Sequence, residues 1–466
     1  MIDSSKKTVV QLRNLTQLLF LFQLTLVLTA CTQNKFKVEQ QITTDFSQNH
    51  DLDNNDNFSP DDQWLVYDTR TEEGGIGANG KIEKVNVTTG EKVTLYELEH
   101  NSAFGPGVGA ASYSHTENHV IFIHGLFNAS PDYPYQQWRR TGVIVEDANL
   151  GAPILMDARD VSVPFTLGAL RGGTHRHEWS GDGQFIGFTY NDALMKKMED
   201  STGINYNLRT IGVSKKDKKV IVKDSLKHES FSGEWFSAIV VKVVPNPKKG
   251  SDEISRAEGD SWVGIGGYKK EDSSKQMARA FIGTVNDKRG KEVQEVFIVD
   301  VPECISCIGE DGPLEGTKTS FPSPPVGTVQ RRLTFTSESR FPGCEGVVRS
   351  AYDASLLAFL AYDNKNIKQV FTIPPTGGKP VQQTFHQSDV QSGVRWHPQE
   401  YRICYVWNNA IVSRKMGGKA FEIYTKPSQN PPMNLVWSHD GRKIAYNRIV
   451  KNAAGKSAKQ LFIIEL

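Results

Sequence analysis

One phrase of hydrophobic and polar positions recurs along the chain. It consists of an aromatic residue, a small or polar residue, a turn rich in Asp, Gly, His or Pro, and a segment in which apolar and polar residues alternate. Alternation with period two predicts a β-strand, and Asp and Gly accept the positive φ of a tight turn. Each copy therefore predicts a β-hairpin. Six copies are present, at residues 58–67, 113–122, 179–188, 350–359, 396–405 and 437–446.

The spacing of these copies predicts the architecture. The last two intervals are on the order of 40 to 45 residues, the length of one propeller blade, and the phrase resembles the WD40-like repeat of TolB-type β-propellers. The longer interval between Trp179 and Ser350 leaves room for a seventh, degenerate blade. The expected fold is all-β, a seven-bladed β-propeller. For the degenerate blade we predict an inner strand at 236–244, further strands at 280–285, 293–300 and 329–335, and a short inserted helix at 251–258.

The two ends of the chain are expected to share one blade. After Trp437 only three strands are predicted, so the last blade needs a fourth. Residues 37–43 contain Val-Glu-Gln-Gln, which is similar to the outer strands that begin at Val329 and Val381. An N-terminal strand in this place would remove the exposed edge of the last sheet. We therefore expect 37–466 to be a single propeller with an insertion at about 245–275.

The first thirty residues are predicted to be a signal peptide. Lys6, Lys7 and Arg13 form a basic start, and the apolar stretch 15–29 is too short and too polar to span a bilayer comfortably. The end of this segment, Leu-Thr-Ala-Cys31, resembles the lipobox of bacterial lipoproteins. That resemblance implies a lipid on the Cys31 thiol.

The lipobox has consequences for location. Several acyl chains hold a protein stably at a membrane, and by family analogy Thr32 in place of Asp implies sorting to the outer membrane. We expect residues 31–36 to be a lipidated tether on the periplasmic side of the outer membrane. A plain signal peptide in which Cys31 is incidental is the alternative.

Charge and composition narrow the class of partner. The 466 residues contain 54 Lys and Arg and 53 Asp and Glu, a net charge of +1. The first thirty contribute three basic residues and one acidic residue, so the remainder is close to −1. This balance argues against a nucleic-acid partner, which needs a basic face. We expect contact with a membrane through the lipid anchor, and a protein or glycan ligand.

Four further cysteines are compatible with a disulfide. Cys304 and Cys307 form a Cys-x-x-Cys pair, but zinc needs a second pair at similar spacing and none is present. No βαβ pattern surrounds the pair, so a thioredoxin-like role is also unsupported. In an oxidising periplasm a local disulfide is expected, with Cys344 as a competing partner. The connectivity, which also involves Cys404, stays open.

The candidate chemistry lies in the segment that leads into the third repeat. Ligands of propellers usually bind at the mouth of the central channel, near the loops that enter the inner strands. His175 and His177 are separated by one residue, and on an extended segment such side chains share one side. With His228 and a carboxylate they could hold a divalent cation (Mn, Ca or Zn), or they could contact an anionic ligand directly. Hydrogen bonds to loop carbonyls and stacking on Trp179 are the structural alternative.

The remaining candidates are charged residues near the ends of predicted inner strands. No catalytic residue is assigned, because no complete catalytic set is visible. The candidate ligand-binding residues are Arg171, Arg176, Glu178, Glu234, Glu345 and Arg349, and the candidate metal ligands are His175, His177 and His228.

The chain also resembles a known family over nearly all of its predicted mature part. Residues 115–125, 157–160, 168–183, 188–192 and 240–262 are similar to the YidR-like family of bacterial propeller proteins. The resemblance implies the propeller fold and no particular reaction. The lipobox is a departure, since soluble members of the family need not share it.

Two classes of function follow. The first, which we favour, is a binding or interaction propeller that is displayed from a membrane and recognises a protein or glycan at its channel mouth. The second is a metal-dependent lyase or hydrolase acting on acidic oligosaccharides. The second rests on a partial resemblance of the paired histidines to the metal site of oligogalacturonate lyases, which are also seven-bladed.

Overall fold

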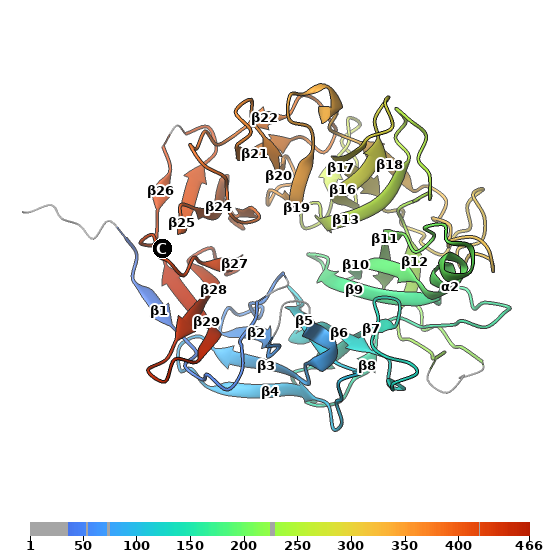
Figure 1. Ribbon diagram of the computed structural model, residues 1–466, viewed down its shortest axis with the longest axis horizontal. Coiled ribbons are helices and arrows are strands. Elements are labelled where there is room, and N and C mark those ends of the chain that lie inside the picture. The colour runs from blue at the N-terminus through green and yellow to red at the C-terminus, as the bar shows by residue number, and fades with distance from the viewer. Residues whose placement is uncertain (1–35, 53–54, 72–74, 224–228, 419) are drawn as a thin grey trace, which may run out of the picture. The chain divides into compact units, whose positions relative to one another are not determined.

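A computed structural model describes residues 36–52, 55–71, 75–223, 229–418 and 420–466. Residues Val38–Leu466 form one compact unit. In this unit seven antiparallel sheets are set around a common axis, as Figure 1 shows. The predicted all-β, seven-bladed propeller is confirmed. We number the blades 1 to 7 in the order in which their inner strands occur along the chain.

The first four blades contain the following strands, given from the inside outward. Blade 1 contains β2 (Trp64–Asp68), β3 (Lys81–Asn86) and β4 (Lys92–Glu97), and its inner edge is a bridge between Phe58 and Leu65. Blade 2 contains β5 (Val108–Tyr113), β6 (His119–Gly125), β7 (Arg140–Glu146) and β8 (Ile154–Leu155). Blade 3 contains β9 (Gly172–Trp179), β10 (Phe185–Asp192), β11 (Arg209–Lys215) and β12 (Phe236–Ile239). Blade 4 contains β13 (Ile254–Trp262), β16 (Ala278–Asn286), β17 (Glu292–Asp300) and β18 (Val329–Arg332).

The other blades follow the same order. Blade 5 contains β19 (Cys344–Ser350), β20 (Leu357–Tyr362), β21 (Lys368–Ile373) and β22 (Val381–Gln382). Blade 6 contains β23 (Arg395–Trp396), β24 (Arg402–Trp407), β25 (Ala410–Lys415) and β26 (Glu422–Ile423). Blade 7 contains β27 (Met433–Trp437), β28 (Lys443–Lys451), β29 (Ser457–Glu465) and β1 (Glu39–Gln41). Outside the blades lie the hairpin β14 (Tyr268–Lys269) and β15 (Lys275–Gln276), α2 (Ala193–Thr202), and the short helices η1 (Gly75–Ala78) and η2 (Thr336–Glu338).

Blade 7 joins strands from distant parts of the sequence. β1 pairs antiparallel with β29, with Glu39 opposite Ile464. The Glu39 carboxylate accepts hydrogen bonds from the Tyr446 hydroxyl at 2.6 Å and from Arg448 Nε at 2.9 Å. These side-chain contacts tie the short strand to β28 as well as to its direct neighbour.

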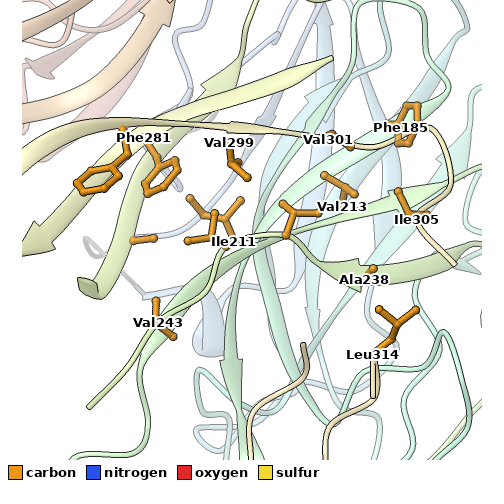
Figure 2. Packing of buried hydrophobic residues seen from close by; sticks show 14 of the residues in the cluster. Phe185, Ile211, Val213, Ala238, Val243, Phe281, Val299, Val301, Ile305 and Leu314 are labelled. Atoms are coloured by element: carbon orange, nitrogen blue, oxygen red, sulfur yellow. The ribbon is translucent and has the colours of Figure 1, made fainter. Parts of the chain in front are cut away.

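Apolar side chains fill the spaces between neighbouring blades. Figure 2 shows one such core, in which Ile211 and Val213 of β11 meet Phe281 of β16 and Val299 of β17. Each of these side chains is buried, and burying a Val, Ile or Phe contributes about 1.5–3 kcal/mol. The propeller is therefore held together mainly by face-to-face packing of sheets.

Two predictions for the degenerate blade are wrong. Residues 236–239 form β12, the outer strand of blade 3, and the inner strand of blade 4 is Ile254–Trp262, where a helix was predicted. Trp262 occupies the place of the repeat aromatic, but a hairpin of its own, β14 and β15, follows it instead of a tight Asp-Gly turn. The strands predicted at 280–285, 293–300 and 329–335 are confirmed as parts of β16, β17 and β18.

The four described cysteines form one disulfide between nearby residues and leave two buried free thiols. Cys304 and Cys307 form a disulfide, whereas Cys344 and Cys404 are free. Cys31 lies outside the described residues. No helix in the described part of the chain has both the length and the apolarity needed to cross a bilayer.

Candidate functional site

The inner strands of five blades share a bulge, and in β9 the residue at this bulge is an arginine. The pairing register between the inner and second strands shifts in five blades, and a residue with positive φ lies at each shift: Ala110, Arg176, Gly259, Gly346 and Asn434. Gly259, Gly346 and Asn434 are amino acids that tolerate left-handed backbone, whereas Ala110 and Arg176 carry its full cost. Arg176 has φ 53°, a conformation that costs a non-glycine residue about 1–2 kcal/mol. A long cation held at this cost points to a role beyond folding.

Arg176 lies among other positive charges. It lines a cavity of about 440 Å³ together with Arg209, Glu258 and Glu345. Burial, followed by repulsion from Arg256, Arg140 and Arg176, lowers the pKa of Arg209 to about 10, against the attraction of Glu258. We call Arg140, Arg176, Arg209 and Arg256 the arginine cluster.

Two members of the arginine cluster, Arg140 and Arg176, form no ion pair with a described residue, although Glu258, Glu292 and Glu345 line the cavities beside the cluster. Glu258 Oε2 is 2.8 Å from Arg256 Nη2 and 3.8 Å from Arg209 Nη1. Among the described residues, Glu258 is the only carboxylate that forms ion pairs with the cluster, and Arg140 and Arg176 form none. A half-buried guanidinium without a counter-ion is unfavourable, so the site is suited to an anion.

A second cavity extends the site away from the axis. It has a volume of about 590 Å³ and shares Arg209, Glu258 and Glu345 with the first cavity. Arg256 and Lys291 add further positive charge along its lining. Arg176, Arg209 and Arg256 thus lie along two adjoining cavities rather than in one closed pocket, whereas Arg140 lines neither cavity and its guanidinium lies over the Tyr135 ring.

His175 is a neutral imidazole beside the arginine cluster. Its side chain is buried, and neither ring nitrogen has a hydrogen-bond partner among the described residues. Burial, with repulsion from Arg209 and Arg140, holds the pKa of His175 well below its usual value. The imidazole is therefore uncharged at neutral pH and is able to accept a hydrogen bond.

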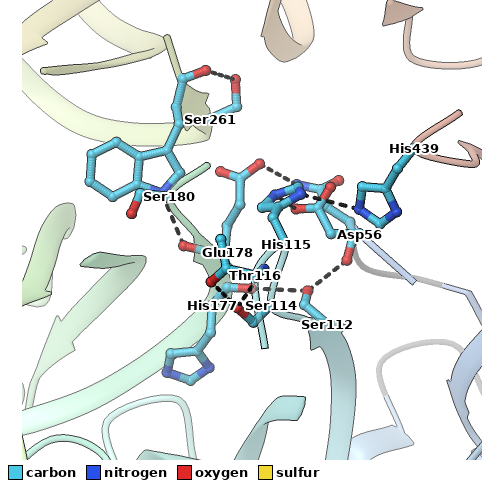
Figure 3. Close-up of polar contacts among 12 residues, drawn as sticks. Asp56, Ser112, Ser114, His115, Thr116, His177, Glu178, Ser180, Ser261 and His439 are labelled. Atoms are coloured by element: carbon cyan, nitrogen blue, oxygen red, sulfur yellow. Dashed lines mark hydrogen bonds and ion pairs between the residues drawn. The ribbon is translucent and has the colours of Figure 1, made fainter. Parts of the chain in front are cut away.

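His177 occupies a different environment. The bulge at Arg176 interrupts the pleat, so the simple alternation that would place His175 and His177 on one side does not apply. The His177 ring lies against Gly142 of β7, where an added Cβ would be 2.9 Å from Nε2. In Figure 3 the ring points away from Glu178 and His115. Burial and then Arg140 lower the pKa of His177 to about 3.

The predicted metal site is only partly described. His228 lies outside the described residues. Within the ranges that the structure describes, no group of three or more His, Cys, Asp or Glu side chains is arranged to hold a metal ion. The cation at His175, His177 and His228 stays a prediction.

Glu178 and Arg349 lie together near the axis. Glu178 Oε1 accepts hydrogen bonds from Arg349 Nη1 and from Asn55 Nδ2, each at 2.9 Å, and Oε2 is 3.1 Å from Arg279 Nη2. Arg279 also contacts Asp260. These charges balance one another, which makes this group of residues a structural network between blades.

The other predicted ligand residues have partners of their own. The buried Arg171 forms an ion pair with Asp192 at 2.7 Å and donates to the Ser320 carbonyl at 2.9 Å, which fixes the loop around that residue. Glu234 is exposed, forms an ion pair with Lys219, and precedes the outer strand β12 rather than an inner strand. The structure does not place either residue in the cavities around Arg176.

Glu345 lies at the cavities but is also paired. It lines both of them, forms an ion pair with Lys368 at 2.5 Å, and accepts a hydrogen bond from the Tyr362 hydroxyl. Sequence reasoning missed Arg140, Arg209 and Arg256. Arg140 and Arg209 begin third strands of their blades, and Arg256 lies in the inner strand that was assigned as a helix.

Comparisons with known proteins place the chain in a family. Residues 107–230 match the family described as "Protein of unknown function (DUF3748)". A structure reported as "Crystal structure of polysaccharide lyase Uly1" has a TM-score of 0.47 at 12% identity, covering 87% of this chain and 88% of that chain. A structure from a study of two prolyl endopeptidases has a TM-score of 0.46 at 10% identity, covering 90% of this chain and 50% of that chain.

A sequence relative extends over most of the chain. "Uncharacterized protein YidR" of Escherichia coli (strain K12) is 36% identical over 408 residues, which are 86% of this chain and 92% of the relative. Identity at this level over such a length is shared by proteins of one family. The chain therefore belongs to the YidR family of β-propeller proteins.

Proposed function

We propose that the protein is a ligand-binding propeller whose arginine cluster binds an acidic oligosaccharide. The observation that carries this proposal is Arg176, a half-buried cation in left-handed backbone that has no ion pair with a described residue and shares a cavity with Arg209. A carboxylate accepts two parallel hydrogen bonds from a guanidinium, and such charge-assisted bonds are the strongest in proteins. An acidic ligand would supply the missing counter-charge.

The form of the site favours a ligand with more than one charge. The two adjoining cavities carry positive groups at Arg176, Arg209, Arg256 and Lys291. A single carboxylate would engage one or two of these residues, whereas successive acidic sugar units would reach several. An oligomer also gains from engaging linked sites at once.

A calorimetric titration tests the proposal. Trigalacturonate is the probe, and the neutral maltotriose is the control ligand. We expect trigalacturonate to bind and Arg176→Gln to weaken it by about 10- to 100-fold, because a hydrogen bond to a charged group contributes about 1.5–3 kcal/mol. Arg289→Gln, which changes an exposed arginine in the β16–β17 turn, is the matched control and should leave binding unchanged. Equal affinity of the Arg176 and Arg289 variants, or no binding of trigalacturonate to the wild type, would contradict the proposal.

A lyase or hydrolase acting on the same ligand class is a second candidate. The buried His175 next to the arginine cluster favours it, because neither ring nitrogen has a hydrogen-bond partner among the described residues and the arginines would neutralise a substrate carboxylate. Turnover would appear as new reducing ends or unsaturated products from polygalacturonate. His175→Ala should then abolish turnover and retain binding. If the wild-type protein binds the ligand but forms no product, the enzyme hypothesis is excluded and the binding hypothesis remains.

We also propose that the propeller is held on the periplasmic side of the outer membrane by lipid on Cys31. The lipobox-like sequence before Cys31 supports this proposal. Cys31→Ser should release the protein into the soluble periplasmic fraction. If the variant is still extracted only by detergent, lipid anchoring at this residue is excluded.

A further inference from the structure

A separate cavity lies at the other ends of the inner strands. It has a volume of about 500 Å³, and the repeat aromatics Phe58, Trp179, Trp262, Trp396 and Trp437 line it. Its polar lining includes Asp56, His115 and His439, which Figure 3 shows close together. Between a quarter and a third of each of these three side chains is exposed. None of them belongs to the arginine cluster.

His115 and His439 face each other at this cavity. His115 Nδ1 is 3.3 Å from His439 Nε2, and the two rings are nearly perpendicular. Each outer nitrogen faces a carboxylate: His439 Nδ1 is 2.9 Å from Asp62 Oδ1, and His115 Nε2 is 3.5 Å from Asp56 Oδ2. The order across the cavity wall is therefore Asp62, His439, His115, Asp56.

The two carboxylates determine where the ring protons lie. An ionised carboxylate only accepts hydrogen bonds, so each outer nitrogen carries the N–H of its ring. In the neutral rings the two inner nitrogens then both present lone pairs, 3.3 Å apart. Facing lone pairs repel each other unless a positive centre lies between them. That centre is either an extra proton or a metal ion.

The geometry fits a metal ion. In a tetrahedral zinc site the Zn–N distance is about 2.0–2.1 Å, which places two ligand nitrogens about 3.3 Å apart. A carboxylate on the outer nitrogen of each imidazole is also the usual arrangement around metal-bound histidines. The local charges suit a cation, because the Asp56 carboxylate is 3.5 Å from His115 Nε2 and the Asp62 carboxylate is 2.9 Å from His439 Nδ1.

We propose that His115 and His439 bind a divalent transition-metal ion, Zn²⁺ or Cu²⁺, whose remaining coordination positions open into the aromatic-lined cavity. The chain supplies two ligands, because no group of three or more His, Cys, Asp or Glu side chains in the described ranges is arranged to hold a metal ion. Asp56 and Asp62 act as positioning residues that fix the two tautomers. Water or a carboxylate of a second ligand would complete the coordination.

Metal titration of the purified full-length protein without a His-tag tests the proposal. Zn²⁺ is titrated against a chromophoric chelator, and Cu²⁺ is followed by electron paramagnetic resonance. We expect one equivalent of metal, with a Cu²⁺ spectrum that shows two imidazole nitrogens. His115→Ala and His439→Ala should each lower the affinity at least tenfold. Asp56→Asn should lower the affinity about 10- to 100-fold while both ligands remain.

A matched control separates this site from casual surface binding. His119 lies a few residues from His115 and faces Glu117 and Glu146, so His119→Ala removes a histidine of similar surroundings and should leave the stoichiometry at one. Thermal unfolding followed by circular dichroism checks that each variant is folded. No metal uptake by the wild type, or uptake that His115→Ala and His439→Ala leave unchanged, would show that a proton bridges the pair and would overturn the proposal. The readout does not depend on anion binding at the arginine cluster.

Discussion

The two ends of the inner strands differ in how their charges are balanced. Near the repeat aromatics, most charged groups occur in pairs, such as Glu178 with Arg349 and Asp62 with His439, while Arg395 donates a hydrogen bond to Asn55 Oδ1. At the arginine cluster, Arg140 and Arg176 have no ion pair with a described residue. A network of oppositely charged side chains stabilises a fold. A half-buried charge without a counter-ion is unfavourable until a ligand of opposite charge binds. We therefore assign the binding of an acidic ligand to the second region, and to the first a structural network that lies beside the proposed metal pair.

The largest expected effect comes from breaking the balanced network. Arg279→Met leaves Glu178 and Asp260 buried with one common partner removed, so we expect the free energy of unfolding to fall by about 3–5 kcal/mol. Urea denaturation measures this change. Arg289→Met in an exposed turn should stay within about 0.5 kcal/mol. A small effect at Arg279 would mean that the network is not structural.

The next effect is a pH dependence on the side of the arginine cluster. Because the pKa of His177 is about 3 in the folded protein against 6.5 in the unfolded chain, only the unfolded chain takes up this proton as the pH falls from 6.5. The free energy of unfolding should then fall by about 1.4 kcal/mol per pH unit for this group. His177→Gln should flatten the slope between pH 6.5 and 3, and the exposed His100→Gln should not. An unchanged slope in the His177 variant would contradict the assignment.

A pH dependence of the free energy of unfolding is also expected from the cavity lined by the repeat aromatics, but below pH 4. Burial raises the pKa of Asp56, but His115, Arg349 and His439 together bring it down to about 2, against 3.8 in the unfolded chain. Its contribution of about 2 kcal/mol is complete above pH 3.8 and is lost as the pH falls toward 2. Asp56→Asn should remove this acid-sensitive part of the denaturation curve. If the curve below pH 4 does not change, Asp56 is not paired as described.

The smallest expected change in stability is at Arg176, and it distinguishes a binding residue from a structural residue most clearly. Arg176→Gly relieves the positive φ at the bulge, so we expect the variant to be more stable by about 1 kcal/mol while it loses trigalacturonate binding. A gain in stability with a loss of binding is the signature of a residue kept for function. Thermal denaturation and calorimetry measure the two changes on one sample. A loss of stability would instead make Arg176 a structural residue.

Much of the fold could be predicted because its signals are local. The repeat aromatic, the tight turn and the alternating strand lie within ten residues of one another, so six hairpins and the blade count follow from short stretches of sequence. The inner strand of blade 4 could not be identified in this way. Its aromatic, Trp262, is followed by the hairpin β14–β15, and the usual turn signal is missing. Acidic residues near 251–258 then gave a false signal for a helix.

The candidate site was less accessible to sequence reasoning. Arg176 stood out because it is close to the repeat aromatic Trp179, but Arg140 and Arg209 lie in other strands and meet it only through the packing of blades 2 and 3. The positions of Arg171 and Glu234 along the chain also predict a place at the site, but both residues form ion pairs elsewhere. The bulge that separates His175 from His177 leaves no clear mark in the sequence, since elsewhere the same position holds Gly, Ala or Asn.

A crystal structure of the protein with trigalacturonate tests the central claim most directly. We predict a sugar carboxylate within hydrogen-bond distance of the Arg176 guanidinium, with a second carboxylate toward Arg209 or Arg256. A ligand found only in the cavity lined by Trp396 and Trp437, with Arg176 left free of it, would contradict the claim.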